Sequence, residues 1–550
     1  MFSSVRSLPL VRLVRRGSTR FDMDFAGLVI FAGLANAALL AIFNAAAENA
    51  SNEAANGRLL ILFGVTIGLY AYAQRYILFT SITEIEKILS GIRVEVANRI
   101  RNTELDELES LGRGEIFGVV ARATQTVSQA ASTLVMALQA TMMVAFSVAY
   151  LAILSKTAFV ITVAMSTIGI FFHLRRVHAL NAMLDAAQRK EDEFLGLLTH
   201  LVEGFKEVRL RKSRSRGLFQ HLRRVSNNVQ QVKTETGREF ATHVIFAQLM
   251  FYVLLAAIVF LLPRLSSEFS TVVLKLTAAI LFIIGPLGGI ISSIQVYSAA
   301  NVAAQSIFDI EERLVAVGPS SDIHEDATAT PPAAFTRIKM SDALFEYPDV
   351  GTGNVFRMGP LNLEVNFGEI LFIVGGNGSG KSTLLKTLTG LYHAQSGEIE
   401  MDGTTLSADS AEWYRSHFAA VFSDYHLFES LYGLESVSAE RVEELLDLMQ
   451  ISDKTTYDHG RFSTLDLSHG QRKRLALLVA LLEDRPILVL DEWAADQDPL
   501  FRKFFYEDLL PKLKEQGKTI VAVTHDDKFF HCADRVVKME YGEFIPFSNA

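Results

Sequence analysis

One stretch of this 550-residue chain decides the fold of its second half, Gly375-Gly-Asn-Gly-Ser-Gly-Lys381-Ser382. The apolar run Ile370–Val374 precedes it, and a segment with helical spacing, 383–391, follows it. A glycine-rich loop between a buried strand and a helix lets backbone N–H groups surround a phosphate, and the helix N-terminus adds a favourable dipole. We therefore predict an α/β P-loop nucleotide-binding domain that takes ATP. The predicted nucleotide contacts are Gly375, Asn377, Gly378, Gly380, Lys381, Ser382 and Thr383.

Chemistry at the phosphates is predicted from this loop and from a second strand. Lys381 would neutralise the β- and γ-phosphates, and the Ser382 hydroxyl would ligate Mg²⁺. The apolar run 487–490 ends in Asp491-Glu492. A carboxylate at a strand end that faces the phosphates holds Mg²⁺ through water, which suits Asp491. Glu492, its neighbour, suits the general base of ATP hydrolysis.

Upstream of this domain the chain is apolar in blocks long enough to cross a bilayer. Half of all residues are hydrophobic, and they gather in the first part of the chain. Six blocks predict spanning helices at 25–47, 59–79, 131–154, 158–174, 246–262 and 272–296. The expected fold is thus an α-helical six-span transmembrane bundle fused to an α/β P-loop domain. We expect a basic arm at 1–22, the membrane domain at 23–318, a linker at 319–334 and the nucleotide-binding domain at 335–550.

The charge of the connections predicts the orientation in the membrane. The segments 81–129 and 175–242 are long and basic, whereas 47–56, 155–157 and 263–271 are short and nearly free of cations. Because basic connections stay in the cytoplasm, both termini are predicted to be cytoplasmic. Reversals are predicted near 109–114 and 204–216, where short transverse helices would touch the nucleotide-binding domain.

The N-terminal arm and the ionisable residues within the apolar blocks each allow two interpretations. The arm is rich in arginine and serine and lacks acidic residues before Asp22, which fits a cytoplasmic basic arm. An organellar transit peptide has the same composition. Arg75 and Lys275 lie within apolar blocks, where they would either face a substrate path or snorkel to the interface.

Composition excludes several other classes of protein. Cys532 is the single cysteine, so the chain can form neither an intrachain disulfide nor a cysteine-rich zinc site. The net charge is −9, and no long basic stripe with interleaved aromatic residues occurs, so no nucleic acid partner is expected.

Between the two nucleotide motifs stands Leu467-Ser468-His469-Gly470-Gln471, which resembles the Leu-Ser-Gly-Gly-Gln signature of ABC transporters. The resemblance covers nearly the whole chain, since a six-helix half and a nucleotide-binding half occur in the order of an exporter half-transporter. It implies that the signature of one subunit closes over ATP held by the loop of another. Ser468, Gly470 and Gln471 would then contact the nucleotide across a dimer interface. The chain has one loop and one signature, which implies a second half-transporter subunit as partner, here a homodimer.

The resemblance also carries three further residues and shows two departures. Tyr347 matches the aromatic residue that stacks on adenine, His525 the switch histidine at the γ-phosphate, and Asp498 the loop that crosses the dimer interface. Ser423 stands where the family usually has glutamine, and His469 replaces the first signature glycine. With Glu492 and His525 present, ATP hydrolysis is still implied.

Three short strings point to one branch of the family. They are Phe422-Ser-Asp, Gly470-Gln-Arg-Lys-Arg-Leu-Ala and Glu203-Gly-Phe-Lys-Glu-Val-Arg-Leu. They resemble bacterial exporters of cyclic peptides and siderophore peptides, similar to those for pyoverdine precursor, syringomycin-type lipopeptides and microcins. This implies ATP-driven export of a peptide-like substrate across the bacterial inner membrane by alternating access. A lipid or multidrug exporter or flippase, and a nucleotide-gated membrane regulator or channel, stay open.

Overall fold

The computed structural model describes residues 9–17, 23–48, 53–111, 116, 118–265, 270–315, 335–346 and 356–546. The chain forms two compact units, an N-terminal unit of residues 1–99 and 114–313 and a C-terminal unit of residues 100–113 and 314–550. The short segment 100–113 therefore groups with the C-terminal unit, although its neighbours in sequence belong to the other unit. The predicted linker and most of the predicted arm lie outside the described residues.

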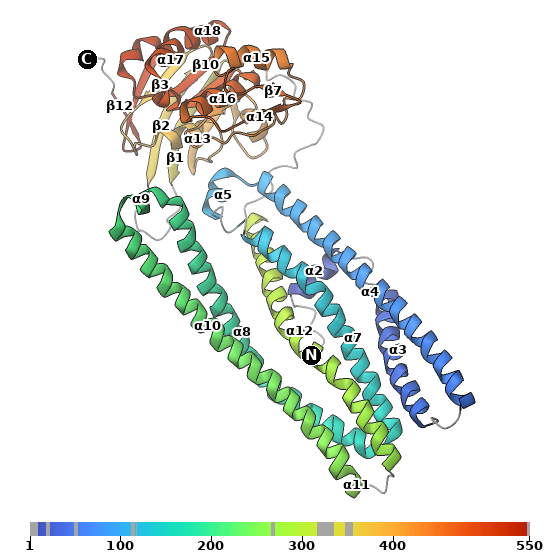
Figure 1. Cartoon of the computed structure of the whole chain (residues 1–550). Helices are drawn as coiled ribbons and strands as arrows, with labels where there is room; N and C mark the ends of the chain where they lie inside the picture. The colour runs from blue at the N-terminus through green and yellow to red at the C-terminus, as the bar shows by residue number, and fades with distance from the viewer. Residues whose placement is uncertain are drawn as a thin grey trace. The chain divides into compact units, whose positions relative to one another are not determined.

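The N-terminal unit is built of long helices that run side by side (Figure 1). Its helical segments are α2 (Pro9–Gly17), α3 (Met23–Glu48), α4 (Glu53–Arg101), η1 (Gly118–Ala123), α7 (Thr124–Leu154), α8 (Lys156–Glu203), α9 (Phe205–Leu210), α10 (Lys212–Ala256), η2 (Ala257–Leu261), α11 (Leu262–Leu265) and α12 (Ser270–Val315). The longest of them exceed a bilayer: α4 has 49 residues and α8 has 48, whereas about 20 residues cross the hydrocarbon core.

Five helical stretches within the described residues are long and apolar enough to cross a membrane. They are Phe25–Glu48, Asn56–Arg101, Val120–Leu154, Lys212–Leu261 and Val273–Leu314. The fourth predicted block lies in α8, where the apolar segment found is the shorter Lys156–Gly169. The structure thus gives an α-helical membrane region with five candidate spans, and the count of six stays a prediction.

Apolar contacts between several helices hold the N-terminal unit together. Leu13 of α2, Leu89 of α4 and Ile307 of α12 are buried in one cluster. Leu151 of α7 and Ile258 of η2 are buried in a second cluster, which also includes residues of α3, α8, α10 and α12. The turn from α7 to α8 is short because Ser155 is extended and its side chain accepts a hydrogen bond from the Ala158 N–H, which caps α8.

The C-terminal unit contains two larger sheets and a two-stranded ribbon. The six-stranded sheet has the order β12-β11-β3-β10-β9-β6, in which all neighbours are parallel except β12 and β11. The four-stranded antiparallel sheet has the order β2-β1-β4-β5. The strands are β1 (Arg337–Glu346), β2 (Arg357–Asn366), β3 (Ile370–Val374), β4 (Ser396–Met401), β5 (Thr404–Thr405), β6 (Phe418–Val421), β7 (Tyr457–Asp458), β8 (Arg461–Phe462), β9 (Ile487–Asp491), β10 (Thr519–Val523), β11 (Arg535–Glu540) and β12 (Glu543–Ile545).

The helices of this unit are mostly short. They are α5 (Leu105–Leu111), α13 (Lys381–Leu388), α14 (Ala411–Arg415), α15 (Ala439–Leu448), α16 (His469–Leu482), η3 (Trp493–Asp496), α17 (Pro499–Phe504), η4 (Phe505–Leu509), α18 (Leu510–Glu515) and η5 (Asp527–Cys532). Figure 1 shows α13 and α16 beside the strands.

The central strands β3, β9 and β10 are buried along their whole length. Side chains of a strand alternate between faces, and in β3 Phe372 packs into one core cluster while Leu371 and Ile373 pack into the other. Parallel strands covered on both faces are continuously apolar, which is why these runs stand out in the sequence. Their carboxyl ends lie at one edge of the sheet, where ligands of such sheets bind.

Candidate nucleotide-binding site

The predicted phosphate loop joins the end of β3 at Val374 to the start of α13 at Lys381. Gly375 has a φ of 156°, and a Cβ there would lie 2.1 Å from the carbonyl oxygen of Met539. No side chain fits at that distance, so glycine is required where the chain leaves the sheet. The strand, loop and helix are thus arranged as the sequence predicts for phosphate binding.

The Lys381 amine lies between this loop and a carboxylate. Its Nζ donates hydrogen bonds to the carbonyl oxygens of Gly375, at 3.1 Å, and Gly376, at 3.0 Å. The same atom is 3.6 Å from Glu492 Oε1, and only 5 % of the lysine side chain is exposed. A buried ammonium group beside backbone N–H groups is the arrangement that neutralises phosphate charge.

Glu492 and His525 meet at the carboxyl edge of the sheet. β9 and β10 are neighbours in register, with Asp491 opposite Val523, so the residues that follow each strand are brought together. His525 Nε2 lies 3.1 Å from Glu492 Oε1. Glu492 has a φ of 48°, a left-handed conformation unusual for a residue with a side chain, and its N–H donates to the Val523 carbonyl oxygen. The structure therefore groups Lys381, Glu492 and His525.

Asp491 fits the chemistry of a magnesium site. The residue is 1 % exposed, and among the described residues neither of its carboxylate oxygens has a hydrogen-bond partner. A buried carboxylate is costly unless something pairs with it. Mg²⁺ binds through one or two protein oxygens and several waters, which a single buried carboxylate suits. Ser382, the second predicted Mg²⁺ ligand, lies in the first turn of α13.

The signature residues begin α16. Ser468 is the N-cap and forms a capping box with Gln471, in which the Gln471 N–H donates to Ser468 Oγ and the Ser468 N–H donates to Gln471 Oε1. A Cβ on Gly470 would lie 2.8 Å from the carbonyl oxygen of Asp496. The start of α16 is therefore packed directly against the loop that follows Glu492.

Sequence reasoning missed the residues that join α16 to this loop. The Lys473 Nζ donates to the Glu492 carbonyl oxygen at 2.8 Å and pairs with Asp496 Oδ2 at 2.6 Å. Gln497 Nε2 donates to the Gly470 carbonyl oxygen at 3.1 Å. Arg474 donates to Gln497 Oε1 and to Asp498 Oδ2. Two signals for these contacts were present in the sequence: the basic string that contains Lys473 and Arg474, and the position of 496–498 close after Glu492.

Asp498 is held by the helix it begins. Its side chain caps α17 by accepting hydrogen bonds from the N–H groups of Leu500 and Phe501. The Phe501 N–H, together with the Arg474 guanidinium, holds the pKa of Asp498 below its usual range. Asp498 is therefore a carboxylate at neutral pH, fixed at the end of the 493–498 loop.

A second missed contact joins α5 to the helix of the phosphate loop. Glu109 Oε1 accepts from Lys386 Nζ on α13 at 3.0 Å, and Glu109 Oε2 accepts from the Tyr392 hydroxyl at 2.6 Å. Glu104 pairs with Arg415, which also donates to the Gly390 carbonyl oxygen. Of the reversal predicted near 109–114, only the end of α5 up to Leu111 lies within the described residues, and α5 joins the C-terminal unit through acidic residues that the sequence did not single out.

Three further positions, one predicted to bind the nucleotide and two in the string that departs from the family pattern, contribute little to the description of the site. Tyr347 lies outside the described residues. Ser423 and Asp424 are exposed in the turn that follows β6, a neighbour of β9 in the sheet.

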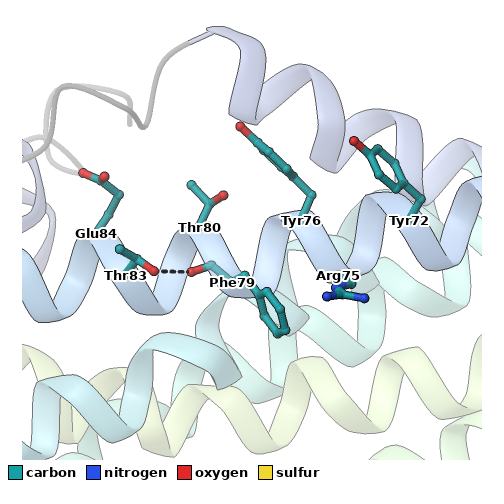
Figure 2. Close-up of a pocket in the computed structure, with 7 residues that line it drawn as sticks. All are labelled: Tyr72, Arg75, Tyr76, Phe79, Thr80, Thr83 and Glu84. Carbon is teal, nitrogen blue, oxygen red and sulfur yellow. Dashed lines mark hydrogen bonds between the residues drawn. The ribbon is translucent and has the colours of Figure 1, made fainter.

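The ionisable residues of the apolar blocks are also placed. Arg75 is exposed on α4, with its guanidinium 5.2 Å from the centre of the Phe79 ring. Figure 2 shows both on one side of α4, with Tyr72, Tyr76 and Thr80 on the other. Together with Thr83 and Glu84 these residues line a pocket of about 320 Å³. Lys275 forms an ion pair: its Nζ lies 2.6 Å from Oε2 of Glu48, the last residue of α3.

Comparison with known proteins agrees with this geometry. Residues 358–495 match the ABC transporter family. The ATP-binding protein SyrD of Pseudomonas syringae pv. syringae is 34% identical over 470 residues, which cover 83% of this chain and 82% of SyrD.

Two other relatives match over shorter stretches. The "probable syringafactin export ATP-binding/permease protein SyfD" of Pseudomonas syringae pv. syringae strain B728a is 33% identical over 229 residues, 38% of this chain and 34% of that protein. An ATP-dependent lipid A-core flippase of Aliivibrio fischeri is 27% identical over 289 residues, 50% of this chain and 47% of the flippase.

The match to SyrD covers 83% of this chain, so it reaches beyond residues 358–495 of the family match into the helical region. The chain therefore belongs to the ABC transporter family, as an exporter-type half-transporter that couples ATP hydrolysis to transport across a membrane.

Proposed function

We propose that this protein exports a peptide-like substrate, such as a cyclic peptide, lipopeptide or siderophore precursor, across the bacterial inner membrane. The cluster of Lys381, Glu492 and His525 beside the buried Asp491 carries the proposal, because it brings together the predicted phosphate-binding amine, general base and switch histidine. The peptide class is supported by the three branch-like strings and by a relative named for syringafactin export.

The residues at the site divide the chemistry between them. The N–H groups of 375–382 and the Lys381 amine bind the phosphates. Ser382 and Asp491 would hold Mg²⁺, which screens the phosphate charge. Glu492 accepts a proton from the attacking water, and His525, 3.1 Å away, orients the Glu492 carboxylate and reaches the γ-phosphate.

Two chains complete two such sites. One chain has a single loop and a single signature, so the Ser468, Gly470 and Gln471 that close over one ATP belong to the other chain of a homodimer. Asp498, fixed by its helix cap, lies in the loop that crosses the interface. Tyr347 would stack on the adenine.

Movement of the nucleotide site reaches the membrane helices through α5. Glu109 bonds to Lys386 on α13, the same helix that begins at Lys381. A shift of α13 when nucleotide binds is therefore passed to α5 and, along the chain, to α4. With six spans and both termini in the cytoplasm, α5 would lie on the cytoplasmic side, where the positive-inside rule also puts the basic residues near α9.

The test is ATP hydrolysis by the purified protein in lipid, with and without a cyclic lipopeptide. We expect the peptide to stimulate hydrolysis, and Glu492→Gln to reduce the rate by at least about 100-fold, because the general base is lost. Glu443→Gln, on the exposed face of α15, is the matched control and should leave the rate unchanged.

Each other outcome points to one alternative. Hydrolysis that depends on Glu492 but ignores peptides would favour a lipid or drug as cargo, which the partial similarity to a lipid A-core flippase also allows. Hydrolysis that is absent, or that Glu492→Gln leaves unchanged, would exclude the pump and favour a nucleotide-gated regulator or channel.

A further inference from the structure

The signature of this chain has a histidine where the Leu-Ser-Gly-Gly-Gln pattern has a glycine. His469 is the first residue of α16, between Ser468 and Gly470, and 54% of its side chain is exposed. A glycine at this position offers only its backbone to a nucleotide. An imidazole adds a hydrogen-bond donor that is cationic when protonated, at a helix N-terminus where anions already bind well.

A fixed carboxylate orients the imidazole. His469 Nε2 lies 3.3 Å from Asp496 Oδ2, in the loop after Glu492. The hydrogen bond from Lys473 holds the pKa of Asp496 below its usual range, so Asp496 stays ionised at neutral pH. Lys473 is itself tied to the Glu492 carbonyl oxygen, at 2.8 Å. The partner of His469 is thus anchored to the same segment that carries the general base.

The other ionisable groups around this pair have fixed charges near neutral pH. The same helix carries two cations, Arg472 and Lys473. Tyr425 lies in the turn after β6, and the charges of Arg472 and Asp496 both affect its pKa. Burial raises the pKa of Tyr425, so its hydroxyl stays protonated. Of the side chain types in this cluster, only histidine ordinarily changes charge between pH 5 and 8.

We propose that His469, oriented by Asp496, is an additional substrate-binding residue that donates to the terminal phosphate of the ATP held by the partner's loop, and that it does so best as imidazolium. This rests on the proposed dimer, in which the signature faces that phosphate. ATP binding then strengthens as the pH falls, because a charged donor binds phosphate more tightly than a neutral one.

The experiment measures the KM for MgATP and kcat between pH 5.5 and 8.5 for the full-length protein in lipid. The nucleotide also changes its ionisation in this range, so the quantity of interest is the ratio of KM values between His469→Gly and wild type. We expect this ratio to be about tenfold at pH 5.5 and to approach one at pH 8.5. His469→Lys, which keeps a cation, should hold a low KM across the range.

A ratio that does not change with pH, or a His469→Lys variant that behaves like His469→Gly, would overturn the proposal and leave His469 as a structural partner of Asp496. The Glu492→Gln measurement distinguishes failure of the His469 proposal from failure of the proposed function as a dimeric pump. If Glu492→Gln abolishes hydrolysis while the ratio is flat, only the role of His469 is wrong. If hydrolysis does not depend on Glu492, the proposed function itself fails.

Discussion

The two units use the same apolar residue types in opposite ways. In the C-terminal unit Phe372 is fully buried between the sheet and its helices, whereas in the N-terminal unit Phe79 is 59% exposed on α4. Water drives apolar side chains into a core, but lipid is itself apolar and removes that drive. A buried apolar side chain therefore indicates a contribution to stability in the C-terminal unit. In the N-terminal unit, an apolar side chain is normally exposed to lipid or to a second chain.

The largest expected difference comes from truncating these two phenylalanines. Phe372→Ala should lower the free energy of unfolding of the C-terminal unit by about 3–5 kcal/mol, because it opens a cavity in a packed core. Phe79→Ala should change it by less than about 0.5 kcal/mol. Both tryptophans, Trp413 and Trp493, lie in the C-terminal unit, so denaturation followed by tryptophan fluorescence reports that unit within the full-length protein.

The contrast between the two units would be wrong if Phe79→Ala shifted the fluorescence transition as far as Phe372→Ala does. That result would mean that the two units unfold as one, so that packing in the membrane region stabilises the nucleotide site directly.

This contrast also explains what the sequence could predict. The phosphate loop was found because its function depends on backbone conformation, which only glycine at positions such as Gly375 permits. Glu492 and His525 lie together because each follows a buried strand, and parallel strands bring their carboxyl ends together. Lys473 and Gln497 were missed because each bonds to a backbone carbonyl of a distant turn, and no local pattern encodes such a contact.

In the N-terminal unit the sequence predicted where helices lie better than what their residues do. Five of the six apolar blocks correspond to candidate spans. The interpretation of Lys275 depended on a partner that the sequence did not indicate, Glu48 on another helix. Helix periodicity specifies a face, but the neighbour of that face is set by packing between helices.

A smaller effect is expected from the contact between α5 and α13 in the C-terminal unit, through which we propose that movement of the nucleotide site reaches the membrane helices. Glu109→Gln weakens two charged hydrogen bonds, worth about 1.5–3 kcal/mol each, to Lys386 and Tyr392. We expect basal ATP hydrolysis to change by less than about twofold, whereas stimulation by peptide is lost. Hydrolysis measured with and without peptide gives both quantities.

Asp106→Asn provides the control for this prediction, because Asp106 lies on the same helix and its carboxylate accepts from the neighbouring Glu107 N–H. Stimulation should survive in this variant. If Glu109→Gln keeps full stimulation, α5 is a passive contact and the signal from the nucleotide must reach the membrane by another route.

The smallest effect is expected within the N-terminal unit, where the end of α3 meets the start of α12. The Lys275–Glu48 pair joins them, but 56% of the Glu48 side chain is exposed, and such pairs contribute about 0–1 kcal/mol. Asn44 is more enclosed, and its Nδ2 donates to the Tyr150 hydroxyl and to the Lys275 carbonyl oxygen. Because the second bond is to backbone, it survives Lys275→Gln.

Hydrogen exchange of residues 270–280 in lipid should therefore rise more in Asn44→Ala than in Lys275→Gln. The reverse order would mean that in this unit charge holds the helix ends together, and that the exposed ion pair is stronger in a membrane than on a water-exposed surface.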